Sequence, residues 1–259
     1  MSRIEAIFRP GYKAFIAYLT VGYPTLETTL EATVLLAHSG CDIIELGIPF
    51  SDPLADGATI QKASYHALKQ GVTPHVCLEV ADRLRREIAT PLVFMSYYNP
   101  ILSFGLKAFC LASAKASVDG LVIPDLPPEE GEEIETSMKE FGLDPIYLLT
   151  PASSGKRISL VTQRSTGFIY LVSLTGVTGA RESLPLELDG FVQRVREKTA
   201  KPLCVGFGIS SPEQARQVTN SADGVIIGSR IIQLIEEDSS LSALKSFALS
   251  IRQALDQGH

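Results

Sequence analysis

The segment 45–57 carries three carboxylates whose spacing suits acid/base chemistry. Glu45 interrupts an apolar run that predicts a buried strand, where an unpaired charge costs several kcal/mol. Because side chains alternate along a strand, Glu45 shares a face with Gly47, which leaves room for a ligand. Asp52 and Asp56 follow in a Pro- and Asp-rich loop, and two acids in different environments form a common catalytic pair. The alternative is a structural Glu45 paired with a buried Arg or Lys, with the two aspartates as turn formers.

The composition predicts a large globular chain and narrows its partners. The sequence has 259 residues and 45% hydrophobic content, which suits one large α/β domain or two small ones. Its 23 Lys and Arg against 29 Asp and Glu give a net charge of −6, which argues against a nucleic-acid or membrane surface. An anionic substrate can still bind through local backbone N–H groups. No linker or low-complexity tract interrupts the chain, so we expect one domain over 1–259.

The cysteines and histidines predict neither disulfides nor a metal site. The four cysteines, Cys41, Cys77, Cys110 and Cys204, are scattered singly without ligand spacing, and the four histidines form no cluster. We therefore expect reduced core cysteines and a cytoplasmic protein. The N-terminus carries no signal-peptide core, and no apolar run reaches the roughly 20 residues that span a bilayer.

Short β-rich runs alternate with helical patterns along the chain. The predicted strands are 15–20, 42–47, 92–96, 119–124, 143–149, 167–173, 202–206 and 223–228. The predicted helices are 25–38, 59–70, 103–117, 128–141 and 210–219, with an extra helical segment in 71–91. Eight such units at this length favour an α/β fold of the closed (β/α)₈ TIM-barrel type, with extra helices. A doubly wound open sheet is the alternative.

A weak internal repeat supports the barrel. Asp42, Asp119 and Asp223 each lie at the entry to an apolar strand, and those strands are even-numbered in the predicted order. Repeated βα units would produce this pattern, although Asp before a strand is also common in unrelated proteins.

The ends of the predicted strands carry further candidates, because a barrel places its site at the C-terminal ends of its strands. The segment 175–179 has two glycines that permit a mobile lid. Two glycine-containing segments, 206–210 and 228–230, each open a helix. Such junctions after strands seven and eight are typical phosphate-binding sites, whereas a single Gly-x-Gly can be a tight turn only.

At these motifs the chain resembles the tryptophan synthase α chain family. The resemblance is dense at 45–57 and continues at 97–100, 124–127, 176–179 and 206–210, in the family's order over essentially the whole chain. It implies a (β/α)₈ barrel that cleaves indole-3-glycerol phosphate to indole and glyceraldehyde 3-phosphate in tryptophan biosynthesis. It also implies that this chain needs no cofactor and binds a β chain carrying pyridoxal phosphate in an α2β2 heterotetramer.

The resemblance assigns roles to individual residues. Glu45 matches the catalytic acid/base and Asp56 the second catalytic carboxylate. The substrate-binding positions are Tyr18, Tyr170, Thr178, Gly179, Phe207, Gly208, Gly228 and Ser229, of which Gly179, Gly208, Gly228 and Ser229 match phosphate contacts. The sequence departs from the usual pattern at four positions, namely Tyr18, Tyr23, Ala58 and Arg230, where Phe, Asp, Pro and a small residue are common. These departures concern pocket fit, loop rigidity and phosphate affinity.

The chemistry of the cleavage agrees with these two carboxylates. The reaction needs a proton delivered to indole C3, charge stabilisation at the indole nitrogen, and removal of a hydroxyl proton. Burial raises the pKa of a Glu toward neutrality, which suits Glu45 to both proton transfers. Asp56, in a more polar loop, suits the nitrogen.

Three other functions remain open at this level. The chain could be another phosphate-binding barrel enzyme, although such an enzyme should carry a Lys or a different acid pair at its strand ends. It could be mainly a regulatory partner of the β chain, or a stand-alone lyase that releases indole.

Overall fold

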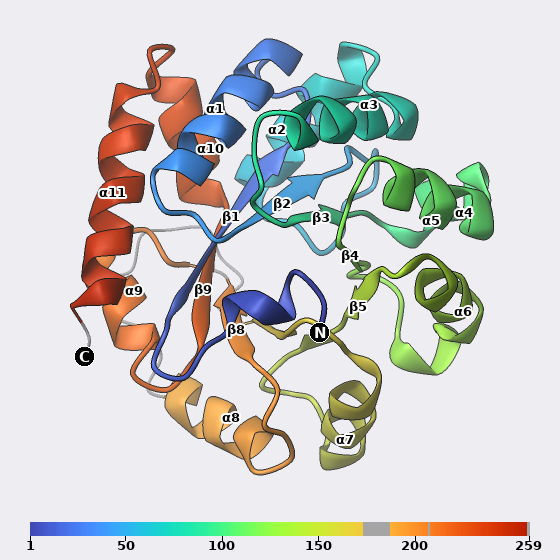
Figure 1. The fold of residues 1–259 in the computed structure, drawn as a ribbon, viewed down its shortest axis with the longest axis vertical. Coiled ribbons are helices and arrows are strands. Elements are labelled where there is room, and N and C mark those ends of the chain that lie inside the picture. The colour runs from blue at the N-terminus through green and yellow to red at the C-terminus, as the bar shows by residue number, and fades with distance from the viewer. Residues whose placement is uncertain (173–186, 207, 258–259) are drawn as a thin grey trace.

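The computed structural model describes residues 1–172, 187–206 and 208–257, which form a parallel barrel ringed by helices (Figure 1). Nine strands are assigned in these residues: β1 (Ala14–Thr20), β2 (Ile43–Gly47), β3 (Leu92–Met95), β4 (Gly120–Val122), β5 (Asp144–Ile146), β6 (Leu148–Leu149), β7 (Ile169–Val172), β8 (Leu203–Gly206) and β9 (Gly224–Ile227). Their order is β5-β4-β3-β2-β1-β9-β8-β7-β6. The predicted barrel is thereby confirmed, and the open doubly wound sheet is wrong.

The fifth predicted strand, 143–149, is interrupted at Tyr147. Its first part, β5, pairs with β4, and its second part, β6, pairs with β7. Between them, the Tyr147 N–H donates to the Ser165 hydroxyl at 3.2 Å, while its carbonyl accepts from the Tyr170 N–H at 3.1 Å. A side chain thus replaces one partner in the backbone ladder, and the barrel still closes through a single continuous segment.

The helices surround the barrel in chain order. They are η1 (Glu5–Ile7), α1 (Leu26–His38), α2 (Ala58–Lys69), α3 (Pro74–Arg85), α4 (Tyr98–Phe104), α5 (Leu106–Lys115), η2 (Pro128–Glu130), α6 (Glu132–Phe141), α7 (Gly155–Arg164), α8 (Glu187–Arg196), α9 (Pro212–Val218), α10 (Ser229–Glu237) and α11 (Ser242–Asp256). The extra helix expected in 71–91 is α3. Helices α7, α8 and α11 were not among the predicted ones.

Several predicted helix boundaries shift for local reasons. The helix predicted at 103–117 is two helices separated by Gly105, whose φ of +96° interrupts the helical path. Thr25 caps α1 as predicted and accepts the Thr28 N–H at 3.0 Å. At α9 the cap is Ser211, because its hydroxyl accepts the Gln214 N–H. The helix predicted to open at Thr59 instead begins at Ala58.

The barrel interior is apolar at its N-terminal end. The inward residues include Ile16, Ile43, Val93, Phe168, Cys204 and Ile226, which form one buried cluster. Ile4, fully buried just before η1, fills that end of the barrel, and Figure 1 shows η1 lying across it. A Cβ built on Gly167, where φ is +68°, would lie 2.9 Å from Ile4 Cγ2. The close approach of Ile4 therefore requires a glycine there.

The three aspartates of the sequence repeat make one recurring contact at that end. Asp42, Asp119 and Asp223 precede β2, β4 and β9. Each carboxylate accepts the backbone N–H of a residue on the neighbouring strand, and these residues are Phe15, Leu92 and Leu203, each at 2.8 Å. The repeat is therefore structural, since it joins pairs of adjacent strands.

An arginine completes each of these contacts. Arg252 of α11 lies 3.0 Å from Asp42, Arg85 of α3 lies 3.1 Å from Asp119, and Arg196 of α8 pairs with Asp223. Each arginine comes from the helix that precedes the contacted strand around the ring. We call the three Asp–Arg pairs with their backbone N–H the Asp clamps. They tie helix to strand at the N-terminal end of the barrel, the end that serves stability and not catalysis in this fold.

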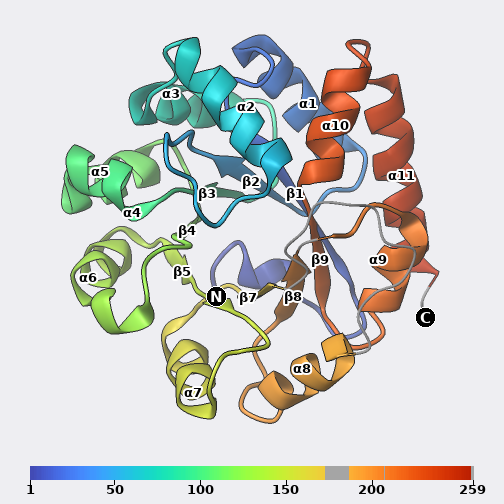
Figure 2. The same ribbon diagram turned by 180° about the vertical axis from the view of Figure 1, so that it is seen from behind.

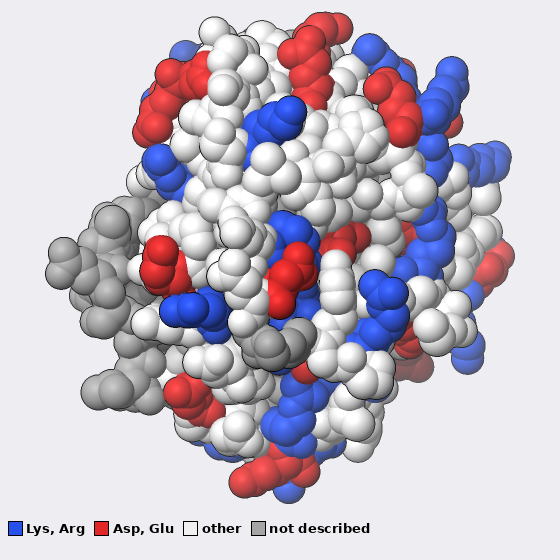
Figure 3. All heavy atoms as spheres, turned by 60° about the vertical axis from the view of Figure 1, so that its left-hand side comes forward, with Lys and Arg blue, Asp and Glu red and all other residues white. Residues whose placement is uncertain are grey.

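The outer surface carries mixed charge. On the face shown in Figure 3, Lys and Arg are interspersed with Asp and Glu, and no broad basic area appears there. Among the described residues, no helix has the length and apolar character needed to cross a membrane.

The Asp clamps predict which acid-to-alanine changes destabilise the fold. Asp119→Ala leaves Arg85, whose side chain is 16% exposed, without its carboxylate, and we expect a loss of about 3–5 kcal/mol in the free energy of unfolding. Asp82→Ala, which breaks an exposed pair with Arg86 near the end of the same helix, should change it by less than about 0.5 kcal/mol. Urea unfolding measures both, and equal losses would contradict a special role for the clamp.

Candidate active site

Glu45 lies in the barrel interior on β2, opposite Tyr18 of β1 and Val93 of β3. Its side chain is almost completely buried, and among the described residues neither carboxylate oxygen has a hydrogen-bond partner. Burial, with a smaller contribution from the charge of Asp56, raises the pKa of Glu45 to about 8. The alternative of a structural Glu45 paired with a buried Arg or Lys is therefore not seen in the described part of the chain.

Asp56 reaches the same site from the loop that joins β2 to α2, a connection that passes over the end of the barrel seen in Figure 2. Its Oδ1 is buried without a hydrogen-bond partner in the described structure. Burial raises the pKa of Asp56 to about 6, while the Tyr97 hydroxyl acts in the opposite direction. Asp52 does not join this pair, because it is exposed and accepts the Ser51 hydroxyl at 2.5 Å. Its role is that of a turn former.

Two buried tyrosines border the carboxylates. A Cβ on Gly47 would lie 2.2 Å from the Tyr18 hydroxyl, and a Cβ on Gly228 would lie 3.2 Å from the same ring, so Tyr18 fits between two glycines. Across the barrel, a Cβ on Gly206 would lie 2.6 Å from Tyr170. These strand-end glycines are therefore small because two rings occupy the space beside them.

The two tyrosines differ in which carboxylate acts more strongly on their pKa. Burial raises the pKa of Tyr18 and of Tyr170 well above the ordinary value. The next contribution comes from Asp56 for Tyr18 and from Glu45 for Tyr170. The Tyr18 hydroxyl also lies 3.3 Å from Thr20 Oγ1. A polar hydroxyl thus lies on the Asp56 side of the site, where a Phe would be apolar.

The N-terminus of α10 supplies the predicted anion site after the last strand. Gly228 precedes this helix, and the first helical hydrogen bond runs from the Ile232 N–H to the Gly228 carbonyl at 3.0 Å. The N–H groups of Ser229, Arg230 and Ile231 therefore have no acceptor within the helix. The Arg230 side chain contacts Glu237 at 3.5 Å, toward the other end of α10. These backbone groups can bind a phosphate through charge and hydrogen bonds.

The glycine segment after β8 is less open than predicted. Gly208 has φ +78°, so a side chain there is strained. The Ser210 N–H and hydroxyl both contact Gln214 Oε1, at 2.8 and 3.1 Å, and the Ser210 N–H is therefore engaged within the protein. Three predicted site residues, Thr178, Gly179 and Phe207, lie outside the described residues.

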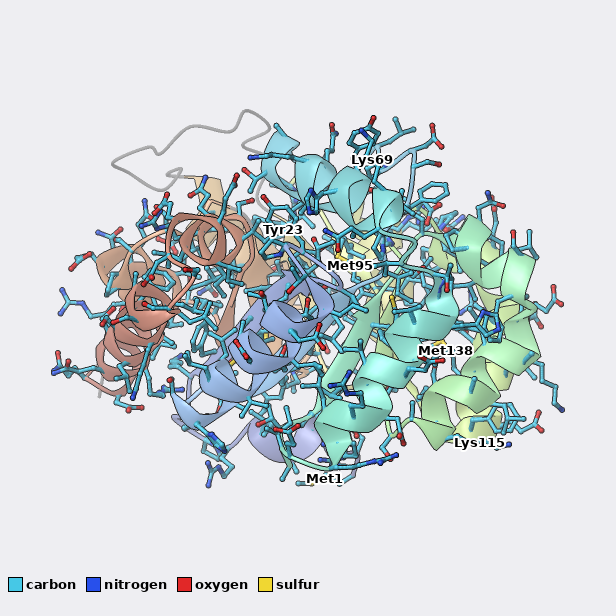
Figure 4. All side chains as sticks on the ribbon, turned by 90° about the horizontal axis from the view of Figure 1, so that it is seen from above. Met1, Tyr23, Lys69, Met95, Lys115 and Met138 are labelled. Carbon is cyan, nitrogen blue, oxygen red and sulfur yellow. The ribbon has the colours of Figure 1, made fainter. Side chains whose placement is uncertain are left out.

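A cavity of about 330 Å³ shares Tyr170 and Ala55, the residue before Asp56, with this site. Its lining includes Ala55, Met95, Leu148, Tyr170 and Val172. Met95 pairs in register with Gly47, and Figure 4, a view of the barrel from the side, places Met95 and Tyr23 away from the end marked by Met1. Sequence reasoning missed Met95, although its position at the end of the third predicted strand was the signal to use.

The described residues contain no group of three or more His, Cys, Asp and Glu that could hold a metal ion. The arrangement offers two carboxylates with raised pKa values, two buried tyrosines beside them, a nearby cavity, and a helix N-terminus for an anion. Such a site suits proton transfer on an aromatic substrate that carries a phosphate.

Comparison with known proteins connects this geometry with a family. The family model described as tryptophan synthase alpha chain matches residues 5–257. The chain is 56% identical over 256 residues to the tryptophan synthase alpha chain of Dehalococcoides mccartyi, covering 99% of this chain and 100% of that relative. It is 48% identical to the relative from Carboxydothermus hydrogenoformans, covering 91% and 90% of the two chains.

Solved structures give the same result. Tryptophan synthase subunit alpha from Legionella pneumophila has a TM-score of 0.92 at 36% identity, with 99% of each chain covered. A tryptophan synthase structure from M. tuberculosis in an open form has a TM-score of 0.91 at 34% identity, covering 98% and 99%. The barrel, the two carboxylates and a match over almost the entire length agree, and the chain belongs to the tryptophan synthase alpha chain family.

Proposed function

We propose that Glu45 and Asp56 are the catalytic residues with which this chain cleaves indole-3-glycerol phosphate, the lyase reaction of its family in tryptophan biosynthesis. The observation that carries the assignment is the buried Glu45 carboxylate, which has no hydrogen-bond partner in the described structure and lies near a second carboxylate. Retaining such a group lowers stability, so its persistence indicates a function.

In the proposed mechanism Glu45 first donates its proton to indole C3. The ring nitrogen becomes positively charged, and ionised Asp56 accepts a hydrogen bond from its N–H and stabilises that charge. Glu45, now a carboxylate, removes the proton from the substrate hydroxyl on the glycerol carbon bonded to C3. The bond between C3 and the glycerol carbon breaks as the aldehyde forms, and its electrons return to the ring. Glu45 ends protonated, so the cycle needs no cofactor in this chain.

The remaining site residues bind the substrate. The N–H groups at Gly228 and Ser229 contact the phosphate, with Gly208 and Gly179 completing its cradle, while Tyr18, Tyr170 and Phe207 contact the indole. Thr178, outside the described residues, is a further proposed substrate contact. Support for this arrangement comes from the position of α10, whose N-terminus adjoins the Tyr18 ring through Gly228.

The whole chain, 1–259, acts as one catalytic domain in this proposal, because a single sheet includes strands from both ends of the sequence. We place the protein in the cytoplasm, where its four buried free cysteines stay reduced. Its partner is a β chain that carries pyridoxal phosphate, in an α2β2 assembly. Leu54, 93% exposed beside Asp56 on the same loop, is an apolar contact for that partner.

Exchanging the Glu45 carboxylate for an amide should separate activity from folding. Glu45→Gln cannot transfer a proton, so lyase turnover should fall by at least about 100-fold. Burial raises the pKa of Glu45 in the folded protein from an ordinary value of 4.5 to about 8. The free energy of unfolding therefore decreases as the pH rises from 4.5 to about 8, because the unfolded chain ionises Glu45 more readily than the folded one. Glu45→Gln lacks this loss, so at pH 8 it should melt at a higher temperature than the parent chain.

The matched control is Glu79→Gln, the same change on an exposed face of α3. It should alter neither turnover nor melting temperature. Near-normal turnover in Glu45→Gln would remove Glu45 from the mechanism.

The pH dependence of kcat/KM should follow the two carboxylates. The active form has Asp56 ionised and Glu45 protonated, so the rate should rise through a pKa of about 6 and fall through a pKa of about 8. The substrate phosphate also ionises near pH ~6, which makes the fall above neutrality the diagnostic limb. Steady-state assays across this range test it, and a constant rate well above pH 8 contradicts the assignment of Glu45.

The partner should increase turnover. A misplacement of about 1 Å in a catalytic group can cost on the order of 100-fold in rate, and a protein that packs against Leu54 would order the Asp56 loop. Adding the cognate β chain should raise the lyase rate at least tenfold, about 1.4 kcal/mol of barrier. Leu54→Asp should reduce this stimulation, whereas Leu249→Asp on α11 should not. Full activity alone, with no complex in sedimentation, would instead indicate a stand-alone lyase.

A further inference from the structure

We propose that Tyr97 is a positioning residue that fixes the Asp56 loop through its phenol hydroxyl. This inference rests on the proposed role of Asp56 and adds a residue to it. Tyr97 directly follows Ser96 at the end of β3 and is the residue before α4, so it belongs to a different βα unit from the loop it contacts. Its side chain is only 5% exposed.

Tyr97 contacts the loop at two points. Its ring stacks on Phe50 near the start of the loop, with centroids 5.2 Å apart and planes inclined by 30°. Its hydroxyl accepts the Ala55 N–H at 2.9 Å, one residue before Asp56. One buried side chain therefore fixes both ends of the segment 50–55.

Two other backbone hydrogen bonds within this loop are local, and the Gln61 side chain of α2 donates to the Asp56 carbonyl at 2.8 Å. The Leu54 N–H donates to the Asp52 carbonyl at 2.9 Å, and the Asp56 N–H donates to the Pro53 carbonyl at 3.0 Å. Such turn contacts set the shape of the loop but do not attach it to the barrel. The attachment comes from Tyr97, because it is anchored at the end of a barrel strand.

The same hydroxyl acts on the charge of Asp56. The oxygen accepts the Ala55 N–H one residue before Asp56, and the hydroxyl lowers the pKa of Asp56 against the effect of burial. Asp56 also faces Glu45 of β2, Tyr18 of β1 and Tyr170 of β7. Of these groups, the Tyr97 hydroxyl is the one that lowers the pKa of Asp56.

The test removes only the hydroxyl and has a control in the next residue. Tyr97→Phe keeps the ring that stacks on Phe50, whereas Tyr98→Phe makes the same chemical change at the first residue of α4, beside Glu130 and Glu133. We expect kcat/KM of Tyr97→Phe to fall about 10- to 100-fold, with its acid limb moved to higher pH. Tyr98→Phe should behave like the parent chain.

Two further measurements separate positioning from general damage. Affinity for glycerol 3-phosphate should be unchanged in Tyr97→Phe, because the proposed phosphate site lies on α10. In an Asp56→Asn background, Tyr97→Phe should cause little additional loss, since the hydroxyl acts through Asp56.

Three results distinguish the role of Tyr97 from the role of Asp56. If Asp56→Asn abolishes turnover while Tyr97→Phe retains the parent rate and acid limb, the positioning role is wrong and the proposed function stands. Loss of glycerol 3-phosphate affinity together with a lower melting temperature would show that Tyr97 is merely structural. Normal turnover in Asp56→Asn would overturn the proposed function itself.

Discussion

The buried carboxylate of Glu45 is the constraint on which the rest of the site depends. In the described structure no donor lies within hydrogen-bonding reach of either oxygen, so the surroundings favour the protonated acid at neutral pH. Asp56 lies close enough to raise that pKa further, whereas the pKa of Asp56 itself, raised by burial and lowered by the Tyr97 hydroxyl, is about 6. The barrel thus separates the protonation states of two neighbouring acids by giving them different degrees of burial and only one of them a nearby hydroxyl.

Three glycines at the ends of barrel strands make space for the tyrosine rings beside the two carboxylates. Gly47, Gly206 and Gly228 lie at or just after strand ends, and each would clash with or press on a tyrosine ring if it carried a Cβ. The rings of Tyr18 and Tyr170 consequently occupy the barrel at the depth of Glu45. Shape and electrostatics are therefore coupled, because the glycines that admit the rings also bring two hydroxyls to the carboxylates.

The sequence was sufficient for the barrel and for Glu45, since strand alternation and a charge within an apolar run are local signals. It placed Asp52 and Asp56 together near Glu45, and the family resemblance selected Asp56. It could not divide the fifth strand at Tyr147, because that break depends on the Ser165 hydroxyl of a later segment. It also did not reveal that Tyr97 contacts the loop carrying Asp56. That contact joins residues 42 positions apart, at Ala55 and Tyr97, and no periodicity in the chain reports it. The Asp repeat was visible, but its arginine partners were not, because they lie on helices elsewhere in the ring.

One of the Asp clamps also bears on how the molecule is assembled during synthesis. Arg252 of α11 bonds to Asp42 across 210 residues of chain, and it also donates to the Lys13 carbonyl beside β1. Strand β1 pairs with β9 as well as with β2. A chain emerging from the ribosome presents β1 and β2 first, yet one edge of β1 stays unpaired until the last strand has emerged. Ring closure is thus postponed to the end of translation, and the nascent half-barrel must remain protected from non-native pairing at that edge.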